Sequence, residues 1–139
     1  MGIESLRIDA WLYSVLSGDA TLVSALGGTK VYSDLAPQDA ALPYVVFGQQ
    51  APHDVMGVGT ARIMVTNVYQ VKVVGQGGSY QPLQAAADQV DALLHAASGT
   101  ASGGTVLACV RDAVIRYTET DDGVQYRHVG GLYRITAQS

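Results

Sequence analysis

Few side chains in this sequence combine the types and the spacing that metal chemistry requires. The histidines His53, His95 and His128 fall on a predicted loop, a predicted helix and a predicted strand. None of them has a second ligand at a spacing such as i, i+4. His53 and Asp54 are adjacent, but one such pair supplies too few ligands for a metal ion. The sequence therefore predicts no metal site.

The single cysteine needs a neighbouring base to act as a nucleophile. Cys109 lies in the apolar run 106–110, which is typical of a buried strand, and we interpret it as a small core residue. Cys109 and His128 could meet across neighbouring strands, but no local signature of a nucleophile–base pair surrounds either residue. We therefore expect no catalytic residue of this kind.

Paired carboxylates are the next group with catalytic potential. Asp121 and Asp122 precede a glycine in a predicted turn, where aspartate is favoured for its turn geometry. Asp88 and Asp91 fall on the solvent side of a predicted helix. General acid–base catalysis requires buried carboxylates with a perturbed pKa, and neither pair has that setting. The carboxylates thus predict no acid–base site.

A glycine-rich stretch, Gly75–Gly78, lies between a predicted strand and a predicted helix, as a dinucleotide-binding turn does. Its glycine spacing does not match that fingerprint, and no parallel β-α-β unit accompanies it. We interpret it as a plain loop and predict no cofactor. A small ligand-binding domain that uses this loop is an alternative from a different functional class.

The helices that must position these side chains follow from hydrophobic periodicity. Apolar residues at helical spacing predict helices over 5–17 and 81–97. Asp19 is expected to cap a short helix that ends near Leu26. The serine- and glycine-rich run 98–104 is expected to be a flexible connector.

Alternation and β-branched residues predict the strands. The expected strands cover 30–35, 44–47, 62–74, 105–110, 113–119 and 124–136. Gly130 and Gly131 in the last of these suggest a bulge or a close backbone approach. The order of elements predicts an α+β fold, a mostly antiparallel sheet with two main helices packed on one face, in one domain over residues 1–139.

Composition narrows the classes of partner. Eight lysines and arginines against twelve aspartates and glutamates give a net charge of −4, which argues against binding driven by nucleic-acid phosphates. The long uncharged run between Asp91 and Arg111 holds a histidine and several glycines and serines, so we expect no membrane span. Charged residues make up only 14% of the chain, and eight residues are tyrosines, which favours self-assembly.

The segment Gln49–Ala61 is predicted to be a loop with an unusual apolar content. A solvated loop has little use for apolar residues between glycines, so it either orders against a neighbouring subunit or folds back onto its own sheet. The candidate subunit-interface residues in this loop are His53, Val55, Met56 and Val58.

Several motifs, in order along most of the chain, resemble the tail-completion or tail-terminator family of long-tailed phages and prophages. The most specific stretch runs from Val31-Tyr32 through Ala36-Pro37 to Leu42-Pro43-Tyr44-Val45. The remaining similar pieces are Trp11-Leu12, Ser17–Leu22, Tyr69–Val74, Ala86–Val90 and Leu93-Leu94. The candidate structural motif comprises Val31, Tyr32, Pro37, Pro43 and Tyr44.

This resemblance implies a structural protein, assembled in the host cytoplasm, that forms a hexameric ring in the virion neck. Such a ring ends the tail tube at its head-proximal end, contacting the tail tube protein on one side and the head connector or head-closure protein on the other. DNA passes through its lumen without specific binding. The resemblance implies no catalytic residue, metal or cofactor. Another neck ring, a head-closure or adaptor protein, is the alternative within the same class.

Overall fold

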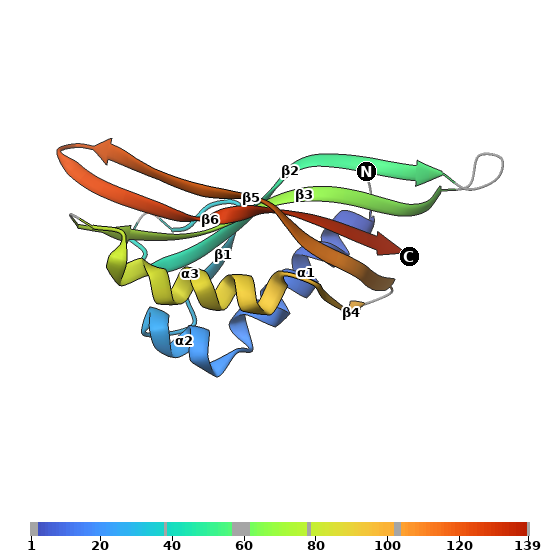
Figure 1. The fold of residues 1–139 in the computed structure, drawn as a ribbon, viewed down its shortest axis with the longest axis horizontal. Helices are drawn as coiled ribbons and strands as arrows, with labels where there is room; N and C mark the ends of the chain where they lie inside the picture. The colour runs from blue at the N-terminus through green and yellow to red at the C-terminus, as the bar shows by residue number, and fades with distance from the viewer. Residues whose placement is uncertain (1–2, 38, 57–61, 78, 102–103, 139) are drawn as a thin grey trace.

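Three helices lie on one face of a six-stranded sheet (Figure 1). The computed structural model describes residues 3–37, 39–56, 62–77, 79–101 and 104–138. The strand order is β1-β2-β3-β6-β5-β4, and every neighbouring pair is antiparallel except β1 with β2. The α+β fold with a mostly antiparallel sheet is therefore confirmed.

The helices begin close to their predicted positions. They are α1 (Ile3–Ser17), α2 (Ala20–Leu26) and α3 (Gln81–Leu94). The Asp19 side chain accepts a hydrogen bond from the Leu22 N–H at 2.8 Å, which confirms it as the cap of α2. α3 ends three residues before the predicted end at residue 97, because His95 already has an extended backbone.

The strands are longer than their hydrophobic patterns suggest, except β1, which is shorter than the predicted strand 30–35. They are β1 (Val31–Ser33), β2 (Tyr44–Met56), β3 (Arg62–Gln76), β4 (Ala97–Ala101), β5 (Gly104–Asp121) and β6 (Val124–Gln138). In Figure 1 the β2–β3 hairpin projects beyond the helices at one end of the sheet, and the β5–β6 hairpin projects at the other. The sheet is thus longer than the helix layer that covers it.

Three further predictions were wrong, each because strand pairing overrode local composition. The predicted loop Gln49–Ala61 is strand up to Met56, since these residues pair with β3 in spite of Pro52. The predicted connector 98–104 contributes to β4, which pairs with the start of β5. The predicted strands 105–110 and 113–119 are one strand with a register shift between Arg111 and Ala113.

The core fills the space between the helices and the sheet. Alternate residues of β3, including Tyr69, Val71 and Val73, point toward the helices and are fully buried, as their period-two pattern predicted. The helices contribute the matching apolar stripes, which are Ile8, Trp11, Leu12 and Leu16 from α1, Leu22 and Leu26 from α2, and Leu83, Ala86, Val90 and Leu94 from α3.

Gly130 marks a close approach between β6 and β3. The register of these two strands runs without a shift past Gly130, so the alternative of a bulge in β6 is wrong. A Cβ atom built on Gly130 would overlap the Val71 carbonyl oxygen and the Lys72 backbone. No side chain fits at this position without moving one of the two central strands.

We therefore expect Gly130→Ala to lower the free energy of unfolding by about 1–3 kcal/mol, the usual cost of overpacking. Chemical denaturation followed by circular dichroism measures this loss. Gly131→Ala is the matched control, because a Cβ there would meet its nearest atoms at 3.0 Å, and one of them belongs to the Arg111 side chain. An equal loss in both variants would contradict the close approach at Gly130.

Candidate assembly interface

The residues considered for catalysis do not converge. Cys109 is fully buried among core residues, and burial raises the pKa of its thiol to about 12, so it is the inert core cysteine that the sequence predicted. Cys109 pairs with Ile135, seven residues along β6 from His128, and the two strand positions face opposite sides of the sheet. Among the described residues, no three potential ligands gather to hold a metal ion.

The glycine-rich stretch after β3 has a packing role in the described residues. Gly75 lies against Leu83 of α3 so closely that a Cβ would overlap the leucine side chain. The Gly77 carbonyl accepts a hydrogen bond from Arg127 Nε at 3.0 Å. β3 is antiparallel to both of its neighbours, so the parallel unit of a dinucleotide site is absent here, and Gly78 lies outside the described residues.

Two buried tyrosines at the centre of the sheet connect it to the helices. Tyr69 of β3 and Tyr133 of β6 are direct cross-strand partners, and both rings are buried. The Tyr69 hydroxyl donates to Asp9 of α1 at 2.6 Å, and the Tyr133 hydroxyl donates to Asp91 of α3 at 2.9 Å. Burial and the adjacent carboxylate raise the pKa of each tyrosine, so both phenols stay protonated donors.

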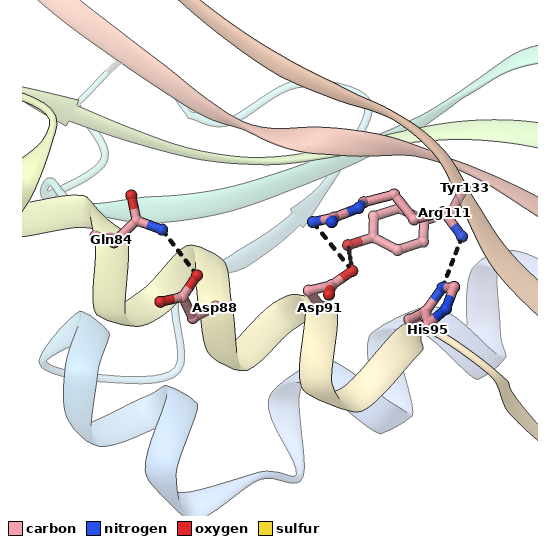
Figure 2. A network of polar contacts seen from close by, with 6 residues as sticks. All are labelled: Gln84, Asp88, Asp91, His95, Arg111 and Tyr133. Carbon is pink, nitrogen blue, oxygen red and sulfur yellow. Dashed lines mark hydrogen bonds and ion pairs between the residues drawn. The ribbon is translucent and has the colours of Figure 1, made fainter.

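Asp91 is therefore not the solvated charge that the helical pattern predicted. Figure 2 shows its carboxylate pointing from α3 toward the sheet, where one oxygen accepts from Tyr133 and lies 3.4 Å from Arg111 Nη1. Asp88, one turn earlier, stays at the surface and accepts from Gln84 at 2.8 Å. His95 at the end of α3 accepts from the Arg111 backbone N–H at 3.2 Å.

Sequence reasoning missed both tyrosine–aspartate pairs, although a signal was present. Asp9 precedes Leu12 and Leu16 by three and seven residues, so it lies within the apolar stripe of α1. Asp91 lies in the same way within the stripe of α3, three residues before Leu94. An acid in an apolar helical stripe, together with a tyrosine at an inward strand position, predicts such a pair.

The helix-free face of the sheet carries a second polar network. The His128 ring is buried, stacks on Tyr117 at 4.3 Å between centroids, and shares a 3.0 Å contact with Glu119 through Nε2. Lys72 Nζ donates to the Tyr117 hydroxyl at 2.7 Å. Burial, followed by the charge of Lys72, lowers the pKa of His128. The network links β3, β5 and β6.

The candidate structural motif borders this face. Val31 is buried in β1, and the Tyr32 ring packs edge-on against Tyr44 with centroids 5.6 Å apart. Pro43 follows a cis peptide bond at the start of β2. Tyr44 lines a cleft of about 360 Å³ and, together with Pro37, an adjoining cleft of about 250 Å³. These residues shape the surface beside the His128 network.

The candidate interface loop forms part of a projecting strand pair. The backbones of His53, Val55 and Met56 lie in β2 and pair with β3. Val58 lies outside the described residues, as do the side chains of the other three. The structure thus places this segment at one extreme end of the sheet (Figure 1).

Exposed apolar side chains gather on β5. Six large hydrophobic residues are exposed among those described, and four of them, Leu107, Val110, Val114 and Tyr117, belong to this strand. Val114 is 65% exposed and lies beside a groove of about 560 Å³ between β5 and α3. β4 covers only the first part of β5, and exposed apolar side chains on a strand with an open edge are typical of an interaction surface.

Comparison with known proteins gives one family. A sequence model of the family described as "Tail completion protein gp17" matches residues 10–135. A solved structure described as "Virion of native gene transfer agent (GTA) particle" is 20% identical, covers 100% of both chains and has a TM-score of 0.83. A second solved structure, also 20% identical, covers 96% of each chain with a TM-score of 0.60. No curated protein matches significantly.

The sequence predicted no membrane span. No helix within the described ranges is both long enough and apolar enough to cross a bilayer.

The Asp9–Tyr69 contact makes a testable prediction about proton binding. Burial raises the pKa of Asp9, the Tyr69 hydroxyl lowers it, and nearby Asp34 raises it. Tyr69→Phe removes the lowering contribution, so we expect the pKa of Asp9 to rise further. Carboxyl carbon NMR across a pH titration measures it directly.

The sign of the accompanying stability change follows from linkage. Folded Asp9 holds its proton more tightly than the unfolded chain does, so stability falls as pH rises from the unfolded to the folded pKa, and Tyr69→Phe widens this interval. Tyr133→Phe is the control, because the hydroxyl that it removes donates to Asp91 and not to Asp9. An unchanged or lower pKa of Asp9 in Tyr69→Phe would refute the assignment.

Proposed function

The chain belongs to the tail completion protein gp17 family of phage tail structural proteins, and from this premise we propose that it forms a ring at the head-proximal end of a tail tube. In this role the ring stops tube growth and presents a surface to the head connector. The observation that carries the proposal is the family match, which spans residues 10–135 and leaves only short ends unmatched.

The fold comparison supports a place in a virion. The solved protein that superposes over the full chain is a component of a gene transfer agent particle, and the superposition has a TM-score of 0.83. We infer that this chain likewise works inside a particle, at the junction of tail and head. Its partners there are the tail tube protein and the head connector or head-closure protein.

The surface composition supports assembly into a ring of identical copies, with six as the proposed number. Only 14% of residues are charged, and four of the six exposed large hydrophobic residues among those described lie on β5. A closed ring uses two different patches on each subunit, because each copy contacts its two neighbours through opposite sides. The projecting hairpins at the two ends of the sheet supply two such sides (Figure 1).

The charge balance supports a passive lumen. A net charge of −4 does not favour contact with phosphates, so DNA passes through the ring without being held. The described side chains form contacts that connect structural elements, and we assign the protein no enzymatic role.

We expect the purified protein to be monomeric or weakly associated and to close into a ring on tail tubes. Native mass spectrometry of the protein alone and of tubes recovered after incubation with it measures both states. A stable isolated dimer that ignores tubes would contradict the proposal. A ring that binds isolated head connectors and not tubes would instead identify another neck protein, such as a head-closure or adaptor ring.

A charge in the projecting β2–β3 hairpin is expected to impair assembly more than folding. Met56→Asp places a carboxylate at the end of β2, where the hairpin projects beyond the helices, so we expect its unfolding midpoint to stay close to that of the parent while ring formation on tubes falls. Thr21→Asp, which adds the same charge at an exposed position in α2, is the control. Unchanged tail length and head joining in particles that carry Met56→Asp would remove this hairpin from the interface.

A further inference from the structure

We propose that neighbouring copies in the ring join by strand addition, in which the open edge of β5 in one copy pairs with the open edge of β2 in the next. This inference rests on the proposed ring and identifies the two surfaces that close it. The proposed contact joins β5, which carries exposed apolar side chains, to β2 in the projecting β2–β3 hairpin of the next copy (Figure 1).

The outer edge of β5 is open over more than half of its length. β4 pairs only with Gly104–Cys109, and no other described strand lies beside the rest of β5. Arg111 still turns its N–H outward, to His95. Along an antiparallel strand, alternate residues direct their backbone N–H and C=O groups to opposite neighbours. The register shift between Arg111 and Ala113 moves this alternation by one residue. The residues after it that direct their backbone groups away from β6 are therefore Val114, Arg116 and Thr118. These groups form a template for another strand.

Side chains on both faces of β5 fit an incoming strand. Val114 borders the groove of about 560 Å³ beside α3 on one face, while Val110 and Tyr117 are partly exposed on the other. A strand added along this edge would cover apolar surface on both faces of the sheet at once. Arg111 and Arg116 also line the groove and would flank that strand with positive charge.

The second open edge belongs to β2. β1 pairs only with Val45–Phe47, so the rest of β2 has β3 as its one described neighbour. The pairing of β3 with β6 ends at Val65 and Ala137, so the described residues of β2 and β3 beyond this pair form a two-stranded ribbon. Such a ribbon is marginal alone and gains stability from a further strand.

Proline placement indicates how β2 is meant to pair. In the alternating ladder, Asn67 and Val65 of β3 direct their backbone N–H and C=O groups toward β6. Their partners on β2 are Pro52 and Asp54, whose backbone groups therefore point away from β3, toward the open edge. Pro52 lacks an N–H, which weakens pairing of β2 with a second β2 more than pairing with a complete partner edge. β5 contains no proline and can offer that complete edge.

Strand direction agrees with this pairing. Within one sheet β2 and β5 run in opposite directions, because three antiparallel steps separate them. In a closed ring whose strands tilt to the ring axis, as the strands of a β-barrel do, β5 of one copy meets β2 of the next as an antiparallel pair. The two patches differ, as ring closure requires. The open parts of β5 and β2 lie at opposite ends of the sheet, so neighbouring copies must be offset along their strands, and the tilt supplies that offset.

Cysteine cross-linking tests the pairing, because the sole native cysteine is buried. Full-length Val114→Cys and Asp54→Cys proteins are incubated with tail tubes, each alone and as an equal mixture, and treated with a short bifunctional maleimide. We expect cross-linked dimers only in the mixture. A chain carrying both substitutions is expected to give a ladder that ends at the closed ring. The control mixes Asp54→Cys with Tyr13→Cys, on the exposed side of α1, in place of Val114→Cys, and we expect it to give no cross-linked dimer.

Each result separates this inference from the proposed function. Dimers from Val114→Cys alone would indicate pairing of β5 with β5 of another copy and would overturn the inference. Dimers from Asp54→Cys alone would indicate pairing of β2 with β2 of another copy and would also overturn it. Rings that form on tubes without any β5–β2 cross-link would overturn the inference and leave the ring role intact. Absence of rings on tubes in native mass spectrometry would overturn both.

A backbone variant adds a second readout. Val114→Pro removes an outward N–H and leaves the β5–β6 ladder bonds in place, so ring formation on tubes should be lost while the fold is kept. Val114→Thr keeps the N–H and should keep the ring. Equal ring formation by both variants, each folded by circular dichroism, would overturn the inference.

Discussion

The structure depends on the pair of tyrosines that face each other at the centre of the sheet. Tyr69 and Tyr133 sit side by side on β3 and β6, and each sends its hydroxyl to an aspartate on a different helix. A hydrogen bond to a charged group contributes about 1.5–3 kcal/mol, and losing one partner of a buried pair costs the desolvation of the other. These two contacts therefore tie α1 and α3 to the centre of the sheet, beside the apolar residues that both helices pack against it.

This arrangement leaves the ends of the sheet uncovered. The helices occupy the middle of one face, while the two long hairpins extend past them in opposite directions (Figure 1). The projecting parts of β2 and β5 each have a backbone edge without a described neighbouring strand, and an open edge is a template for pairing with another chain. A subunit of a closed assembly gains two distinct surfaces, and the low charge content of the chain suits their burial.

Polar chemistry in this protein serves architecture. The His128 network joins three strands on the helix-free face, and the Asp91 cluster joins α3 to β5 and β6 (Figure 2). Cys109 is held as a buried thiol of raised pKa. We infer a protein whose selected property is the shape and complementarity of its edges, in keeping with a family of tail completion proteins.

The sequence by itself determined the local elements whose signals are periodic. Signals within a few residues of one another predict four features of the fold. These are the apolar stripe of α1, the aspartate cap of α2, the alternation of β3 and the turn before β6. Only the tertiary structure decided the length of β2 and β5, the strand at 97–101 and the burial of Asp91, because each depends on a partner distant in the chain. Strand pairing and buried hydrogen bonds are non-local, so composition around Pro52 or Gly99 indicated a loop where a neighbouring strand supplies the hydrogen bonds.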